Sequence, residues 1–350
     1  MPSRLTASPL PRSVRGPAPA RPGRTWSRLS DVLATRLPGL DPGGPPAPPE
    51  AALPAPRAGH WTRDDQIEGL IRVADREPDI GFMVRLLALC TLPRTDPGTL
   101  THYVRRNGRY ALVVIAGGPE PRLPFGVLPR LLLAWICTEA VRTRSRRLVL
   151  GRSVAEFMRR LGVQSSDSAG RYGIRTRLRE QMTRLFRASI ELTQDLPDGV
   201  HTVADRVTTD MRLWWKPRRS DEAVRWDSAI VLGHDFFNEI LAAPVPIDMQ
   251  VLRELTRSSL GLDLYLWLTY RLFRLDRPLS LTWRQVYRQF APRPELEPGR
   301  SVKDFRRDVL RELGKIRIAW PQLSYSTPKG LLVLRPSPPR VPPEVSTEAL

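Results

Sequence analysis

Basic side chains recur at helical spacing in the segment RSVKDFRRDVLRELGKI (300–316). Four of them fall on one helical face: Arg300, Lys303, Arg307 and Arg311. The opposite face carries apolar residues: Val302, Phe305, Val309, Leu313 and Ile316. Guanidinium groups form paired hydrogen bonds with guanine and with phosphate, so a helix that is basic on one side and buried on the other is suited to binding nucleic acid. A solvated helix face without a ligand is the alternative interpretation.

A second basic segment, RYGIRTRLREQMTRLFRASIEL (171–192), has a similar pattern. Its inner face is predicted from Ile174, Leu178 and Leu185. Three arginines at its beginning are candidates for nucleic-acid contacts: Arg171, Arg175 and Arg179. Thr176, Thr183 and Arg187 also point outward and suit phosphate contacts, which position a protein without reading sequence. The alternative is a helix that holds a domain interface.

Basic turns follow both segments, each between two expected strands. One contains Arg218 and Arg219, and the other contains Lys329, which is the candidate contact there. Such turns can touch a nucleic-acid backbone, although turns are also commonly basic for solubility. Tryptophans 214, 215 and 226 could stack on unpaired bases, but their alternating spacing favours packing in a sheet.

No residues have the spacing of a catalytic or metal site. The sequence contains neither a GxxxxGK(S/T) phosphate loop nor a GxSxG nucleophile motif. His102, Arg105 and Tyr110 only partly match the residue set of a strand-transfer enzyme, because Tyr110 lies only five residues after Arg105. Cys90 and Cys137 are far apart in apolar segments, which excludes a zinc ribbon and a disulfide scaffold. We expect a binding protein, not an enzyme, with no cofactor, metal or small-molecule substrate.

The elements expected around the basic helices follow one order twice: a helix, a short helix, a loop, a basic helix and two strands. In the first copy, Ser153 is the expected N-cap of the short helix. This order predicts an α+β fold with two tandem winged helix-turn-helix domains, mainly helical with small antiparallel sheets, related by duplication. Other expected elements are helices at 67–77 and 82–90 and strands at 110–116, 201–215 and 224–237.

The composition sets the expected domain organisation. Hydrophobic residues make up 41% of the 350 residues, enough for a core, and the net charge of +19 favours a polyanionic partner. We expect a proline-rich disordered tail at 1–60, an N-terminal winged-helix domain with preceding helices at 61–243, a C-terminal one at 244–336 and a disordered tail at 337–350. The longest apolar stretch is too short to cross a bilayer, so we expect a cytoplasmic protein without membrane contact.

Several segments, in this order, resemble the plasmid-encoded RepA replication initiators. They are RNGRYALVVIAG, LPFGVLPRLLLAWICTEAVRTRSRRLVLG, SVAEFMRRLG, LWW, WDSAIVLGHDFFNEILAAPVPID, LGLDLYLWLTYRL, LTWRQVYRQF, KDFRRDVLRELGKI and GLLVLRPSPPRV. The resemblance implies binding of repeated origin sequences (iterons) in double-stranded DNA, and help in opening the origin. It implies main contacts from residues 300–311 and secondary ones from residues 171–179. It also implies the host initiator and replicative helicase as partners, with a homodimer as one form of the protein. The long proline-rich head departs from this pattern.

Three other functions stay open. A winged-helix transcriptional repressor would use the same basic residues on operator DNA. A strand-transfer enzyme would require His102 and Tyr110 for cleavage of a phosphodiester. A basic scaffold for acidic partners would bind DNA with little preference for sequence.

Overall fold

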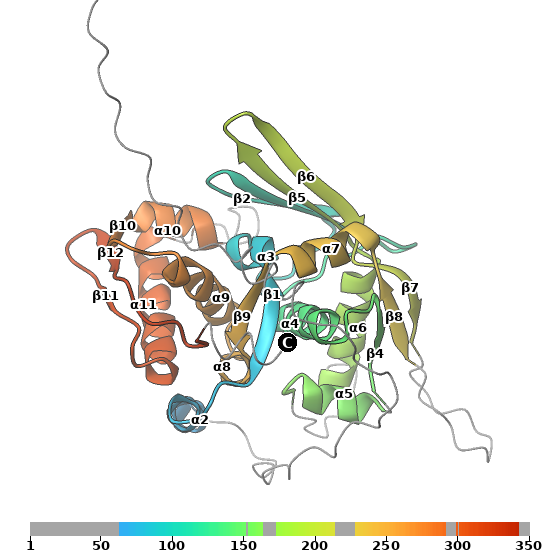
Figure 1. Ribbon diagram of the computed structural model, residues 1–350, viewed down its shortest axis with the longest axis horizontal. Helices are drawn as coiled ribbons and strands as arrows, with labels where there is room; N and C mark the ends of the chain where they lie inside the picture. Colours follow the sequence, from blue (N-terminus) through green and yellow to red (C-terminus); the bar gives the residue numbers. More distant parts are fainter. Residues whose placement is uncertain are drawn as a thin grey trace, which may run out of the picture.

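The computed structural model describes residues 63–151, 153–163, 173–213, 228–291, 299 and 301–342. Helices and small antiparallel sheets are mixed along these residues, which confirms the α+β class (Figure 1). The predicted tail at 1–60 lies outside the described residues, as do residues 343–350.

One group of elements, here called the first unit, spans residues 127–232. In chain order it contains α4 (Val127–Thr143), β4 (Arg147–Val149), α5 (Val154–Arg160), α6 (Ile174–Arg187), β7 (Thr208–Arg212) and β8 (Ala229–Leu232). Its strands form a sheet in the order β4-β8-β7. Ser153 caps α5 as expected, because its Oγ accepts a hydrogen bond from the backbone amide of Glu156 at 3.1 Å.

The second unit spans residues 259–334 and repeats this arrangement. It contains α9 (Ser259–Phe273), β10 (Leu279–Thr282), α10 (Trp283–Phe290), α11 (Val302–Ala319), β11 (Tyr325–Ser326) and β12 (Leu331–Leu334). The sheet order is β10-β12-β11. Thr282 and Gln285 form a reciprocal capping box at the start of α10. In both units the last strand therefore lies between the other two, and the same kinds of element follow in the same order.

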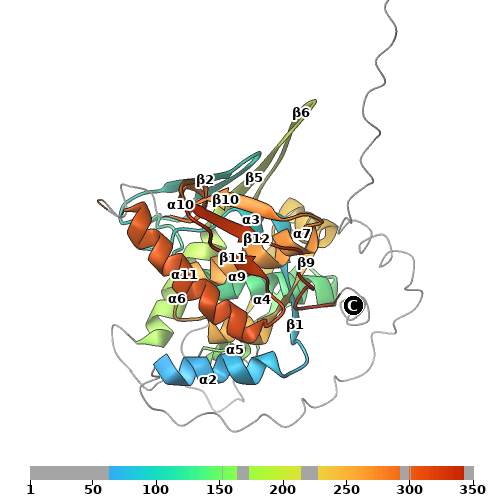
Figure 2. The same ribbon diagram turned by 90° about the vertical axis from the view of Figure 1, so that its left-hand side faces the viewer.

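A hairpin is inserted into the first unit between α6 and β7. Its strands β5 (Ser189–Leu196) and β6 (Gly199–Arg206) extend the hairpin of β2 (His102–Asn107) and β3 (Tyr110–Ile115) into a sheet of order β2-β3-β5-β6. The β5–β6 end projects from the molecule (Figures 1 and 2). The strand predicted at 201–215 is thus two strands, divided at the buried Val207, whose amide bonds the Ala188 carbonyl at 2.9 Å.

The strand predicted at 224–237 is also shorter than expected. Within it the structure has only β8, and His234 starts helix α7 (His234–Ala242). The amides of Asp235 and Phe236 donate to the Asp205 carboxylate at 2.9 and 3.2 Å, which satisfies two donors at the start of this helix. The apolar run AIVL and the aromatic pair after it therefore belong to different elements.

A two-stranded sheet joins the beginning of the described chain to its middle. Strand β1 (Ile80–Val84) pairs antiparallel with β9 (Pro244–Asp248), and α2 (Arg63–Ala74) packs against α11 and α8 (Met249–Glu254). The helix predicted at 82–90 is therefore wrong in its first part, and only α3 (Arg85–Leu89) is helical. All five residues of β1 are buried, so no alternation of polar and apolar residues marked it as a strand.

The segment 337–342, predicted to be the start of a tail, packs on the body of the protein. Arg340 donates to the Asp248 carboxylate at 3.0 Å and to the last carbonyls of α2, with Val73 at 2.6 Å. Burial raises the pKa of Asp248, and the Arg340 guanidinium opposes this. The tail boundary at 337 is thus placed too early, since Arg340 satisfies acceptors that two other elements leave open.

The first helices of the two units are joined by a buried ion pair. In α4, Nε and Nη2 of Arg130 donate to the two carboxylate oxygens of Asp263 in α9 at 2.7 and 2.8 Å. Both side chains are 3% exposed. The remaining Arg130 donors bond carbonyls of Leu92, Pro93 and Gly126. Every N–H of this guanidinium group therefore has a partner in the interior.

The two cysteines give a test of the core. Cys90 and Cys137 are both buried, and burial raises the pKa of each thiol to about 12. The reactive thiolate is scarce at pH 8 under these conditions. We expect neither thiol to react with Ellman's reagent in the native protein and both to react in denaturing urea. Rapid reaction of one thiol without urea would contradict this packing.

Candidate nucleic-acid interface

Helix α11 has one buried and one basic face, as predicted. Phe305, Val309, Leu313 and Ile316 are all fully buried. Ser301 caps the helix by accepting from the Asp304 amide at 3.0 Å. Val302 departs from the prediction and is 39% exposed, because the packing against α10 begins at Phe305, whose ring meets Tyr287 edge-on at 5.3 Å. In Figure 2 the helix lies along the face turned to the viewer.

The basic face of α11 presents Lys303, Arg307 and Arg311, all exposed. Arg307 pairs with Asp304 at 3.3 Å and Arg311 pairs with Asp308 at 2.9 Å, each one helical turn back. These carboxylates hold the guanidinium groups at the helix surface and neutralise part of their charge. Spacing of three residues between each acid and its arginine is the sequence signal for these pairs, and the pair with Asp308 was not predicted. Arg300 lies outside the described residues.

Helix α6 occupies the place in the first unit that α11 has in the second. Leu178 and Leu185 are buried as expected, whereas Arg175 and Arg179 are exposed. Arg177 is exposed on the same helix and was missed, although it stands between two predicted contacts. Arg171 lies outside the described residues.

A different arginine of α6, Arg184, turns toward the protein. Its guanidinium lies 5.2 Å from the centre of the Phe125 ring and forms ion pairs with Glu180 and Asp96. Arg175, Arg177 and Arg179 in the N-terminal half of the helix are exposed, as is Arg187 at its C-terminal end.

Lys329 is exposed in the turn between β11 and β12. The turn is closed by a hydrogen bond from the Leu331 amide to the Pro328 carbonyl at 3.0 Å. Gly330 has φ +80°, a conformation that favours glycine. Arg218, Arg219 and the tryptophans at 214, 215 and 226 lie outside the described residues.

The structure separates the residues that partly matched a strand-transfer enzyme. His102 pairs with Ile115 at one end of the β2–β3 hairpin, while Tyr110 pairs with Asn107 at the other. Arg105 is buried and donates to the Tyr103 hydroxyl at 2.6 Å. These three side chains thus have separate surroundings.

Comparison with known proteins identifies part of the chain. Residues 123–285 match the family model described as plasmid encoded RepA protein. This region, a little under half of the chain, contains the whole first unit and the beginning of the second; α11 follows it. No curated protein matches this chain. In the described part of the chain, no helix has the length and apolar character needed to cross a membrane.

Two solved structures of domains 2 and 3 of RctB are similar in fold. One, from selenomethionine derivatives, is 14% identical with a TM-score of 0.45 and covers 72% of this chain and 99% of that chain. The other is 13% identical with a TM-score of 0.42 and covers 71% and 96%. The family match confirms the resemblance stated from the sequence: residues 123–285 of this chain are similar to the plasmid-encoded RepA family.

Proposed function

We propose that this protein is a replication initiator that binds repeated sequences in double-stranded origin DNA through two winged-helix units. The observation that carries the proposal is the repeated order of elements, in which α6 and α11 hold the same position and both expose arginines. In a winged helix-turn-helix, the helix at this position enters the major groove. The family match supports replication initiation as the use of this binding.

The two basic helices receive different roles in this proposal. Lys303, Arg307 and Arg311 of α11, with Arg300 before them, make the main base contacts. Secondary contacts to phosphates come from the N-terminal half of α6, through Arg171, Arg175, Arg177 and Arg179. Lys329 touches the backbone from the β11–β12 turn. Net charge of +19 makes the phosphate contribution large and dependent on salt.

Binding rather than catalysis would open the origin. Copies on adjacent iterons bend the DNA together, and the strain favours melting of a nearby AT-rich stretch. The host initiator and replicative helicase then load on the opened strands. We propose no enzymatic step, because His102 and Tyr110 stand at opposite ends of a hairpin. Supercoiled DNA should stay intact with the wild type; nicking abolished by Tyr110→Phe or His102→Ala would overturn this.

The experiment that tests the proposal is a gel shift and footprint on the DNA flanking this gene. It is run near physiological salt with excess nonspecific competitor, because phosphate contacts alone give binding at low salt. Regularly spaced protection over direct repeats supports an initiator. Protection of a single operator over the promoter favours the repressor alternative. Binding that the competitor abolishes would overturn sequence-specific recognition.

Arg307→Ala should weaken specific DNA binding by about 1–3 kcal/mol and relax specificity at one base pair. Arg307 is 74% exposed and is held by Asp304, so its guanidinium is oriented before DNA arrives. Dissociation constants are measured for the footprinted site and for its single-base variants. Arg277→Ala, which removes the same charge from an exposed turn, is the control. An equal loss on every sequence would make Arg307 a phosphate contact.

A further inference from the structure

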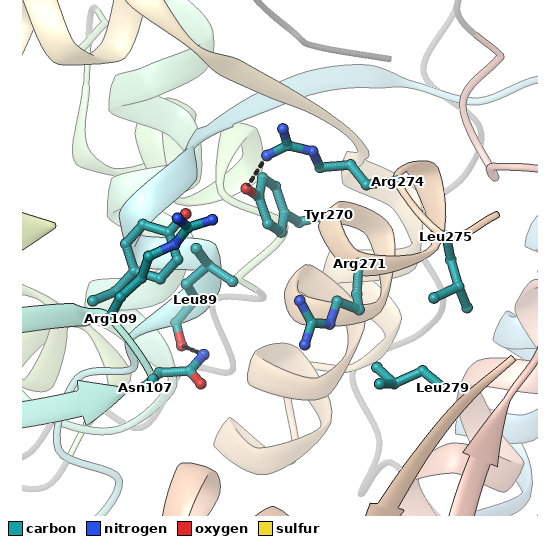
Figure 3. Close-up of a pocket in the computed structure, with 10 residues that line it drawn as sticks. Leu89, Asn107, Arg109, Tyr270, Arg271, Arg274, Leu275 and Leu279 are labelled. Carbon is teal, nitrogen blue, oxygen red and sulfur yellow. Dashed lines mark hydrogen bonds between the residues drawn. The ribbon is translucent and has the colours of Figure 1, made fainter. Parts of the chain in front are cut away.

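A pocket of about 500 Å³ lies between the β2–β3 turn and the C-terminal end of α9 (Figure 3). Arg109 comes from the turn, and Arg271 and Arg274 come from α9 and the residue that ends it. The volume is within the range of small-molecule sites in proteins. None of these residues belongs to the basic face of α11 or α6.

The charges around this pocket are unbalanced. Three of its ten lining residues are arginines, and none is an aspartate or glutamate. Within the described chain, no carboxylate pairs with Arg109, Arg271 or Arg274, although Arg184 and Arg253 each have such a partner. Cations gathered without a counter-charge repel one another, and this repulsion is relieved when an anion enters.

Arg271 has an unused donor in this place. Its Nε is buried without a hydrogen-bond partner among the described residues. In Figure 3 its side chain extends into the space between α9 and the β2–β3 turn. A buried N–H without an acceptor is unfavourable, so an acceptor supplied by a ligand would gain a charge-assisted hydrogen bond.

The rest of the pocket is apolar and aromatic. Tyr270 is 3% exposed, and its hydroxyl accepts a hydrogen bond from Arg274 Nη1 at 2.5 Å. Leu89, Leu275 and Leu279 also line the pocket. The amide of Asn107 is already bonded to the Leu89 carbonyl at 3.0 Å. An anion attached to an apolar or aromatic group therefore fits this lining better than a bare ion.

We propose that this pocket binds a small organic phosphate of up to mononucleotide size. A phosphate monoester carries a charge of about −1.5 to −2 at pH 7 and three acceptor oxygens, which matches several guanidinium groups better than a single carboxylate does. The arginines hold the phosphate, and the tyrosine and leucine side chains contact the organic group.

The position of the pocket separates it from the proposed DNA surface. Leu279 pairs with Leu334 at one end of the β10–β12 ladder, whereas Thr282 pairs with Leu331 at the end next to the Lys329 turn. The pocket therefore lies at the end of this ladder that is away from the Lys329 turn. The lining comes from α3, from the β2–β3 turn of the four-stranded sheet and from the second unit, so a bound ligand contacts all three.

Calorimetric titration of the full chain, freed of nucleic acid, tests the proposal at low salt. The probes are adenosine 5′-monophosphate, inorganic phosphate and adenosine. We expect the monophosphate to bind, inorganic phosphate to bind more weakly and adenosine not to bind. Arg271→Gln and Arg109→Gln should each weaken binding of the monophosphate by about tenfold or more. Arg109 is exposed in a turn, so its variant tests the site even when Arg271→Gln fails to fold.

Arg277→Gln is the matched control, because Arg277 is exposed near the end of α9 and is absent from the pocket lining. It should bind the monophosphate like the wild type. Three outcomes overturn the proposal: no phosphate compound binds, Arg277→Gln loses as much affinity as Arg271→Gln, or Arg271→Gln and Arg109→Gln both bind the monophosphate like the wild type. No DNA is present in the titration, so its result is independent of the proposed origin binding.

Discussion

Replacing Arg130 with methionine should lower the free energy of unfolding by about 3–5 kcal/mol. The substitution leaves the Asp263 carboxylate 3% exposed without its cation, and it removes the side-chain donor of the carbonyls of Leu92, Pro93 and Gly126. A buried charge without a partner is far more costly than the loss of one contact. Urea unfolding followed by circular dichroism measures the change.

Two further variants show whether the buried charge is the cause. Arg160→Ala breaks an ion pair of the same 2.7 Å length with Glu156, but on the surface, and should cost at most about 1 kcal/mol. The double variant Arg130→Met, Asp263→Leu should recover much of the loss, since it removes both charges. Equal effects of Arg130→Met and Arg160→Ala would contradict the burial of this pair.

Phe305→Ala should cost about 3–5 kcal/mol of folding stability. The ring is fully buried in the face of α11 that packs on α10, where it contacts Tyr287, and the Arg94 guanidinium lies 5.6 Å from its centre. Removing the ring leaves a cavity, and α11 cannot move to close it because the helix also packs against α9 and α2. Thermal or urea unfolding of the full chain is the measurement.

Val302→Ala on the same helix is the control for Phe305→Ala. Val302 is 39% exposed, so its truncation should change stability by less than about 1 kcal/mol. Sequence periodicity alone would have placed both residues in the core. Unchanged stability of Phe305→Ala would mean that the face of α11 now assigned to the core, and with it the assignment of Arg307 to the outside, is wrong.

Local patterns predicted the parts of the site that lie within one helix. The basic face of α11 and the cap at Ser153 depend on residues at most a few turns apart, and both were found from spacing. The repeated order of helices and strands was visible for the same reason. Arg300 and Arg171 stay predictions, because both lie outside the described residues.

Contacts between distant segments could not be predicted in this way. Strand β1 is buried on both sides and pairs with β9, so its sequence resembles that of a buried helix. Arg130 within an apolar helix was a signal for a buried partner, but nothing local identifies Asp263. The arginine pocket combines Arg109 with Arg271, and no pattern in either segment refers to the other.

The hydrogen bonds of Arg340 also bear on how the chain folds while it is being made. Arg340 and Val73 are 267 positions apart, so α2 is synthesised long before the residue that completes its C-terminal end. Strand β1 likewise cannot pair until β9 has been synthesised. Contacts between such distant positions form slowly, because a long loop must close before they contribute. A nascent chain therefore cannot bury the apolar residues of α2 and β1 in their final contacts until most of the protein has emerged.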